Sequence, residues 1–142
     1  MTSPQPPRAW SVRFTPHATD EALEAAARWA ELNAPETSGE ERQQRALAWY
    51  AGMEAAAGTL ATNPRRFAVR ERESRLLGLQ VHALLHRHTA GGGGGGAYHA
   101  FYQVEDDTPD GPRVTILHVR HAARRPLTRA EAREIQTGPN EP

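Results

Sequence analysis

Two segments in the first half of the chain carry apolar stripes with helical spacing, and a short turn-forming stretch joins them. Residues 18–32 repeat apolar side chains at alternating steps of four and three, namely Ala18, Ala22, Ala25, Trp29 and Leu32. Residues 40–62 do the same with Ala46, Trp49, Met53, Ala56 and Leu60. Between them, residues 33–39 include Pro35, Ser38 and Gly39. The pattern predicts two antiparallel helices whose stripes, including Trp29 and Trp49, form a shared core.

Strand patterns lie on both sides of this helical hairpin. Residues 10–14 alternate apolar and polar side chains before Thr15-Pro16, which predicts a short strand. Residues 98–105 and 114–121 are further strands, and the link 106–112 centres on Asp110-Gly111, so these two should pair as a hairpin. Residues 79–87 are a fourth strand, with either Val81, Ala83 and Leu85 or His82, Leu84 and His86 on its buried face.

The remaining segments complete the expected organisation. Residues 1–9, rich in proline, are expected to be a disordered lead, and residues 65–78 an extended, Arg-rich connection. The domain proper spans residues 10–127 and includes a flexible glycine loop at 90–97. Residues 128–142 are a short helix and a fraying tail, and Thr128 with Glu131 three residues later predicts the helix start.

These elements favour an α+β fold. The antiparallel helical hairpin should pack on one face of a small antiparallel sheet that also includes the N-terminal strand. The other face of the sheet should then remain partly open, and we expect a partner to bind there.

Composition narrows the class of protein. The 142 residues contain no cysteine, which excludes disulfides and thiolate metal sites. No apolar run approaches the roughly 20 residues of a membrane span, and the first residues lack the pattern of a signal peptide. We therefore expect a cytoplasmic protein that does not interact with a membrane.

The charge of the chain is balanced overall but unevenly distributed. All 17 basic residues are arginine, against 17 acidic residues. Residues 1–60 hold 5 Arg and 8 acids, whereas residues 61–142 hold 12 Arg and 9 acids. The planar guanidinium suits phosphate and carboxylate ligands, so the second half should present a modest basic surface.

Histidines and glycines are concentrated in the second half. Six of the seven histidines lie between His82 and His121, but none stands at a recognised metal-ligand spacing. We expect ordinary strand histidines, no metal and no cofactor. The run Gly91–Gly96 is followed by neither Lys-Ser/Thr nor a helix start, which predicts a flexible hairpin tip and no phosphate-binding loop.

The order of strand, two helices and three antiparallel strands resembles the RelE/ParE superfamily of bacterial toxins from toxin–antitoxin pairs. The residues that carry the resemblance span 10–127: Phe14-Thr15, Trp29, Asn63-Pro64-Arg65-Arg66, Tyr98-His99-Ala100-Phe101-Tyr102-Gln103-Val104-Glu105-Asp106-Asp107 and Val114-Thr115-Ile116-Leu117-His118-Val119-Arg120-His121. The resemblance implies a cognate antitoxin as partner. It also implies a target, either messenger RNA on the ribosome or DNA gyrase; loss of toxicity, leaving an interaction module, is a further alternative.

The resemblance also suggests site residues for the RNA-cleaving alternative. His99, His121 and Arg124 would be catalytic, and Arg87, Arg120 and Tyr102 would bind the substrate. His99 stands where many family members have arginine, a departure that removes a permanent positive charge and favours the gyrase alternative. Two of these groups have ordinary structural interpretations: Tyr102 as a core residue, and Arg120 to Arg125 as a solvated strand end.

Overall fold

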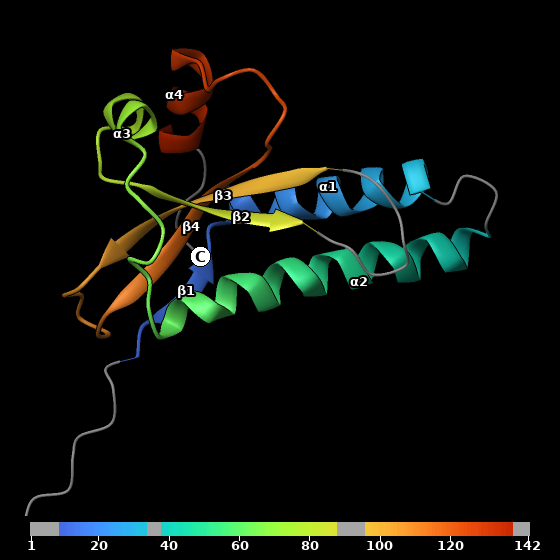
Figure 1. Cartoon of the computed structure of the whole chain (residues 1–142), viewed down its shortest axis with the longest axis horizontal. Helices are drawn as coiled ribbons and strands as arrows, with labels where there is room; N and C mark the ends of the chain where they lie inside the picture. Colours follow the sequence, from blue (N-terminus) through green and yellow to red (C-terminus); the bar gives the residue numbers. More distant parts are fainter. Residues whose placement is uncertain (1–8, 34–37, 88–95, 138–142) are drawn as a thin grey trace, which may run out of the picture.

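The computed structural model describes residues 9–33, 38–87 and 96–137 and has the predicted α+β architecture (Figure 1). Its elements, in chain order, are β1 (Ser11–Phe14), α1 (Pro16–Asn33), α2 (Gly39–Gly58), the 3-10 helix η1 (Thr59–Ala61), α3 (Glu71–Leu77), β2 (His82–Arg87), β3 (Ala97–Glu105), β4 (Arg113–His121) and α4 (Arg129–Thr137). Most of the lead 1–9, most of the glycine loop 90–97 and the tail beyond residue 137 fall outside the described residues.

The four strands form one sheet in the order β1-β4-β3-β2. The predicted hairpin of β3 and β4 is confirmed, and β2 extends it on the other side of β3, so that three strands are antiparallel. The N-terminal strand differs from the prediction, because β1 lies parallel to β4 and the sheet is therefore mixed. Register pairs Phe14 with Ile116, which leaves the rest of β4 without a strand on its outer edge.

The helical hairpin packs on one face of the sheet, as predicted. Trp49, Met53 and Tyr102 are among its fully buried side chains, and Trp29 is also buried. The predicted stripe of α1 is wrong at its end, where Leu32 is 70% exposed. Figure 1 gives the reason: the end of the hairpin where α1 stops and α2 starts projects past the sheet, so Leu32 has no sheet face to cover.

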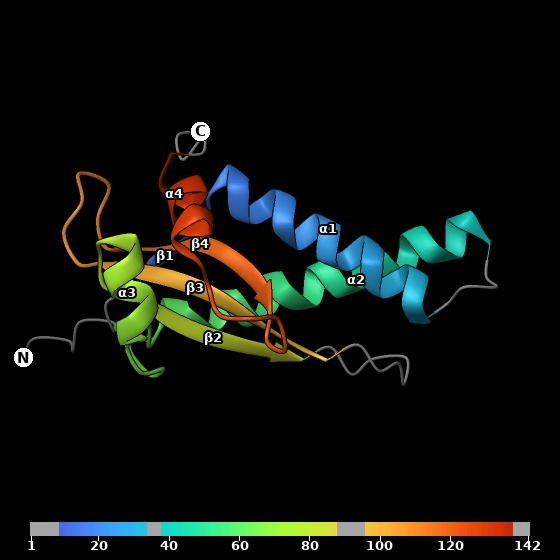
Figure 2. The same cartoon turned by 90° about the horizontal axis from the view of Figure 1, so that it is seen from above.

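The opposite face of the sheet is not open as we expected. Helices α3 and α4 pack there side by side, as Figure 2 shows, over a second apolar core. This core includes Leu77, Val81, Phe101, Leu117 and Ile135. Burial of these side chains stabilises the two short helices, which have too few residues to be stable alone. Helices α3 and α4 do not fill the end of this face near the start of β3, where a cleft lies beside His99.

The prediction of an extended connection at residues 65–78 is wrong for its second half, which forms α3. Glu71 and Glu73 lie in the first turn of this helix, where carboxylates are favourable near the positive end of the helix dipole. Gly78 ends it in a left-handed conformation, with φ of 73° and its N–H bonded to the Ser74 carbonyl. A seven-residue helix with two leucines is too short to show a helical period in sequence.

The predicted start of the last helix is confirmed as a capping box. The Glu131 N–H donates to Thr128 Oγ1 at 3.2 Å, and the Thr128 N–H donates back to Glu131 Oε1 at 3.1 Å. The helix itself runs from Arg129 to Thr137.

Strand β2 is shorter than predicted and is buried on both faces. Val81 and Ala83 belong to the core under α3 and α4, whereas Leu84 belongs to the core under the helical hairpin. Leu85 is 51% exposed.

Among the described residues, no helix combines the length and apolar character that crossing a lipid bilayer would require.

Candidate functional site

A cleft of about 450 Å³ opens at the uncovered end of the second sheet face, between α3, the end of β4 and the segment that leads to α4. We call it the basic cleft. Its charged and ionisable lining residues include Arg70, Arg72, Glu73, His99, Arg120, His121, Arg124 and Arg125. Arginines outnumber carboxylates in this lining, which gives the cleft a positive potential suited to an anionic ligand.

Helix α3 and the residue before it supply one wall of the basic cleft. The Arg70 guanidinium lies 3.4 Å from Glu73 Oε1 and 5.9 Å from the centre of the Phe101 ring. Arg72 Nη2 donates to the Leu127 carbonyl at 2.7 Å, and Arg72 Nη1 lies 3.7 Å from Glu73 Oε2. Both arginine side chains are more than 40% exposed, so each can still present N–H donors to a ligand.

The turn after β4 supplies the opposite wall, and the buried Arg120 fixes its shape. Arg120 Nε and Nη2 donate to the Arg125 carbonyl at 3.2 and 2.7 Å. The Arg124 N–H donates to the His121 carbonyl at 3.0 Å, which closes the turn. Arg124 and Arg125 are consequently held with exposed side chains at the rim of the basic cleft.

The carboxylate of Glu131 balances the charge of Arg120. Arg120 Nη1 donates to Glu131 Oε2 at 2.8 Å, and Arg124 Nη2 lies 3.1 Å from the same oxygen. The hydrogen bond from Arg120 lowers the pKa of Glu131 from 4.5 to about 2, against an opposing effect of burial and with help from Thr128. Glu131 is therefore ionised at neutral pH.

His99 lies in the basic cleft with its ring edge-on to Phe101, at 5.7 Å between ring centres. Burial lowers the pKa of His99 from 6.5, and the nearby charge of Arg70 lowers it further, while Glu73 opposes the change. The imidazole is therefore neutral at neutral pH and can accept a proton.

His121 reaches the same end of the sheet from the other face. Register pairs His121 with Tyr98 and His99 with Arg120, so the two histidines leave the sheet on opposite sides. The His121 ring packs edge-on against Tyr98 at 4.9 Å, and its Nδ1 accepts a hydrogen bond from the Ala123 N–H at 3.0 Å. His121 also borders a second cleft of about 770 Å³ that runs along α1.

The other residues suggested by the resemblance lie in different environments. Arg120 is only 5% exposed and is committed to Glu131 and Arg125. Tyr102 is fully buried under the helical hairpin, and its hydroxyl donates to the Pro64 carbonyl at 2.6 Å, so a ligand could reach it only if the core opened. Arg87 is exposed at the end of β2, opposite Ala97. The structure thus brings His99, His121, Arg120 and Arg124 to one end of the sheet and keeps Tyr102 and Arg87 away from the basic cleft's lining.

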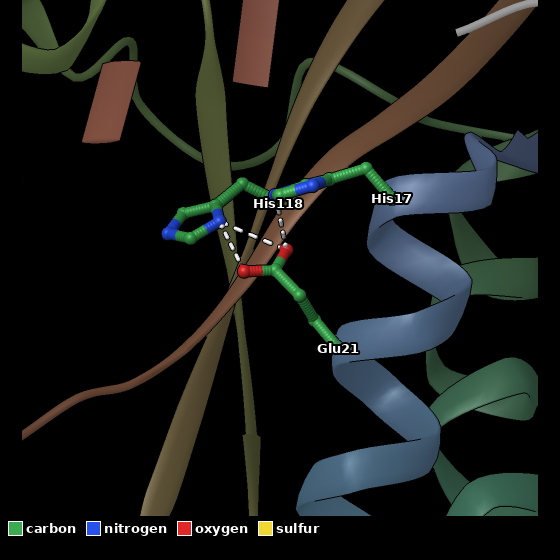
Figure 3. A group of neighbouring side chains, drawn as sticks. All are labelled: His17, Glu21 and His118. Carbon is green, nitrogen blue, oxygen red and sulfur yellow. Dashed lines mark hydrogen bonds and ion pairs between the residues drawn. The ribbon is translucent and has the colours of Figure 1, made fainter. Parts of the chain in front are cut away.

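A line of polar side chains connects the basic cleft with helix α1 at the edge of β4 that β1 does not cover. Arg120 Nη1 lies 3.4 Å from His118 Nε2, and His118 Nδ1 lies 2.8 Å from Glu21 Oε2. The Val119 N–H donates to Glu21 Oε1 at 3.0 Å, so this carboxylate replaces the missing strand neighbour. Figure 3 shows His118 and His17 on either side of Glu21.

Several of these residues were missed by the sequence analysis. The sequence analysis interpreted the segment of Arg70, Arg72 and Glu73 as extended. A signal for a helix was present there, because acidic residues at 71 and 73 are typical of a helix start and Gly78 is typical of a helix end. No local signal could have paired His118 with Glu21, because 97 positions separate them.

Neither family models, nor curated proteins, nor solved structures gave a match to this chain.

Proposed function

We propose that this chain is the toxin of a bacterial toxin–antitoxin pair of the RelE/ParE type, and that it cleaves messenger RNA bound to the ribosome. The observation that carries the proposal is the basic cleft, which His99 lines together with exposed arginines on two walls. Arginine on both sides of a groove suits the phosphate groups of a nucleic acid strand.

These residues could cleave a phosphodiester bond of RNA by transesterification. The neutral His99 would take the proton of a ribose 2′-hydroxyl, whose oxygen then attacks the adjacent phosphorus to form a 2′,3′-cyclic phosphate. The bond from phosphorus to the 5′-oxygen of the next nucleotide breaks, and that oxygen takes a proton from water. Arg124 and Arg125 from one wall, with Arg70 and Arg72 from the other, would stabilise the negative charge that develops on the phosphate oxygens. Arg120 would act as a positioning residue, because it holds the turn that carries Arg124 and Arg125.

The alternative target is DNA gyrase, bound without any chemical step. One observation favours it. His99 and His121 leave the sheet from opposite faces, so the two rings do not form an evident acid–base pair. An inhibitor of this kind would not need the neutral imidazole of His99, and its potency would survive the loss of that ring.

The experiment that tests the proposal is induction of this chain in a bacterial host, with translation, messenger RNA ends and DNA damage measured together. The variants are His99→Gln and Arg125→Gln, and Arg45→Gln on α2 is a control on the other side of the sheet. New messenger RNA ends that disappear with His99→Gln and Arg125→Gln, but persist with Arg45→Gln, would support RNA cleavage. Growth arrest with DNA damage and normal translation would support gyrase instead, and no arrest would leave an interaction module without toxicity.

A further inference from the structure

We propose that His17, Glu21 and His118 form a binding site for a divalent transition-metal ion, independent of the proposed function. The nitrogen and oxygen atoms that these residues offer all lie within 4.8 Å of one another. Figure 3 shows the three side chains converging from α1 and β4.

Two of the three separations between the ligand atoms are close to those around a tetrahedral ion, and the third is at most 4.8 Å. His17 Nε2 lies 3.2 Å from Glu21 Oε1, and His118 Nδ1 lies 2.8 Å from Glu21 Oε2. Ligand atoms around a tetrahedral zinc ion are roughly 3.3 Å apart, since each lies at about 2.0–2.1 Å from the metal. Small side-chain movements would therefore be sufficient to admit the ion.

The backbone already holds these ligands in place. His17 and Glu21 are four residues apart on α1, so their side chains extend from the same face of the helix. The Val119 N–H donates to Glu21 Oε1 at 3.0 Å, which orients the carboxylate and still leaves lone pairs on both of its oxygens for an ion. Such supporting hydrogen bonds are typical of protein metal ligands.

The state of His17 is the second observation that points to a ligand. Its Nε2 is buried from solvent and makes no hydrogen bond with any described residue, because its contact with Glu21 has the distance but not the angle of one. A buried ring nitrogen without a hydrogen bond is unfavourable unless something else satisfies it. A metal ion between His17 and Glu21 would do so.

The choice of ions follows from the ligands. Two imidazoles and one carboxylate favour Zn²⁺, Co²⁺, Ni²⁺ or Cu²⁺ over Mg²⁺ and Ca²⁺, which prefer oxygen ligands. Three protein ligands leave a fourth position for water or another ligand. Glu21 borders the cleft along α1, so this position would face the solvent there.

Metal binding would change the contact between His118 and Arg120. In the present arrangement Arg120 Nη1 donates to His118 Nε2 at 3.4 Å, which puts the ring proton on Nδ1, facing Glu21. An ion on Nδ1 would move that proton to Nε2 and break the contact, because two donors would then face each other. Arg120 would keep Glu131 and the Arg125 carbonyl as partners, so the basic cleft would keep its shape.

The test is titration of the purified, tag-free chain with Co²⁺, followed by its visible absorption bands, and competition of Co²⁺ by Zn²⁺. We expect one ion per chain. His17→Ala should weaken Co²⁺ binding at least tenfold. The His17 ring makes no hydrogen bond with any described residue, so the fold should survive its loss. His99→Gln, at a histidine on the same sheet but outside the trio, should leave binding unchanged.

Two results would overturn the proposal. One is the absence of Co²⁺ absorption bands in a chain whose circular dichroism shows it to be folded. The other is binding that His17→Ala and Glu21→Gln leave intact, since the ion would then sit elsewhere. Because the readout is absorption and not toxicity, failure here would leave the proposed RNA cleavage untouched.

Discussion

The guanidinium of Arg120, near the end of β4, lies 2.8 Å from the Glu131 carboxylate in the first turn of α4. Both side chains are largely buried, at 4% and 16% exposure. The same carboxylate accepts the capping bond of Thr128, and the same guanidinium binds the Arg125 carbonyl. This one ion pair therefore joins the sheet, the last helix and the wall of the basic cleft.

Glu131→Gln should destabilise the protein at neutral pH and have little effect in acid. The pKa of Glu131 is lowered from 4.5 to about 2 in the folded chain. The carboxylate therefore contributes stability above the unfolded pKa, and this contribution is lost as the pH falls from about 5 to about 2. We expect a loss on the order of 2 kcal/mol at pH 7, after allowance for partial solvent exposure.

Urea unfolding of the wild-type chain and of Glu131→Gln, at pH 7 and near pH 2.5, measures this difference in the free energy of unfolding. Glu134→Gln, an exposed carboxylate on the same helix, is the matched control and should change the free energy of unfolding by less than about 0.5 kcal/mol. A Glu131→Gln effect of equal size at both pH values would contradict the assignment of the ion pair.

Tyr102→Phe should cost stability without affecting the proposed RNA cleavage. The substitution keeps the ring but removes the hydroxyl that donates to the Pro64 carbonyl at 2.6 Å, leaving a buried acceptor without its partner. We expect a loss of about 1–2 kcal/mol in the free energy of unfolding. Tyr50→Phe, at a half-buried ring on α2, should lose less.

The assay is run at a temperature at which Tyr102→Phe is fully folded. If the variant then fails to cleave RNA, Tyr102 has the substrate-binding role that the family resemblance suggested. Calorimetric melting curves, recorded beside the cleavage assay, separate the two explanations.

His99 should titrate below the ordinary range of histidine. Burial and Arg70 both lower the pKa of His99 from 6.5, and Glu73 opposes them, so the ring is expected to be neutral at pH 6.5 and above. Arg70→Gln should move the midpoint upward, because it removes a positive charge that disfavours the imidazolium. NMR titration of the His99 ring protons measures both midpoints.

If RNA cleavage uses His99 as a base, the rate should fall as the pH drops through the same midpoint, and the Arg70→Gln profile should shift with it. A His99 midpoint above 6.5 in the wild-type chain would be inconsistent with the geometry of the basic cleft.

Gly96→Ala should disturb His121. Gly96 has a φ of 77°, and an added Cβ would come within 2.7 Å of His121 Nε2. The left-handed backbone alone disfavours alanine by about 1 kcal/mol, so a total loss of roughly 1–2 kcal/mol is expected together with a displaced His121 ring. Thermal melting and the NMR shifts of His121 measure the two effects.

Gly39→Ala is the control for this glycine, because nothing lies within 4 Å of a Cβ at that position in the first turn of α2. It should leave His121 unchanged. If Gly96→Ala left the His121 resonances in place, the close approach of this backbone to the ring would be refuted.

Local signals in the sequence were sufficient for much of the fold. The stripes that bury Trp29 and Trp49 identified the helical hairpin, because an amphipathic helix has to repeat its apolar residues along one face. Turn residues before Gly111 identified the hairpin of β3 and β4. The pair of Thr128 and Glu131 identified the start of α4, since a capping box is complete within four residues.

The tertiary structure decided what local pattern could not. Helix α3 forms because Leu77 finds a core with Ile135 on the far sheet face, although seven residues alone would not stay helical. The same packing covered a face expected to be open and reduced the candidate site to the basic cleft.

The chemistry of the edge of β4 belongs to the tertiary structure as well. The sequence determined that six histidines gather in the second half, but not that His118 would meet Glu21 and His17 from the first helix. Because β1 stops at Phe14, the edge of β4 beyond Ile116 is left to side chains of α1. Contacts between residues this far apart depend on how the elements pack, so no local pattern in the sequence predicts them.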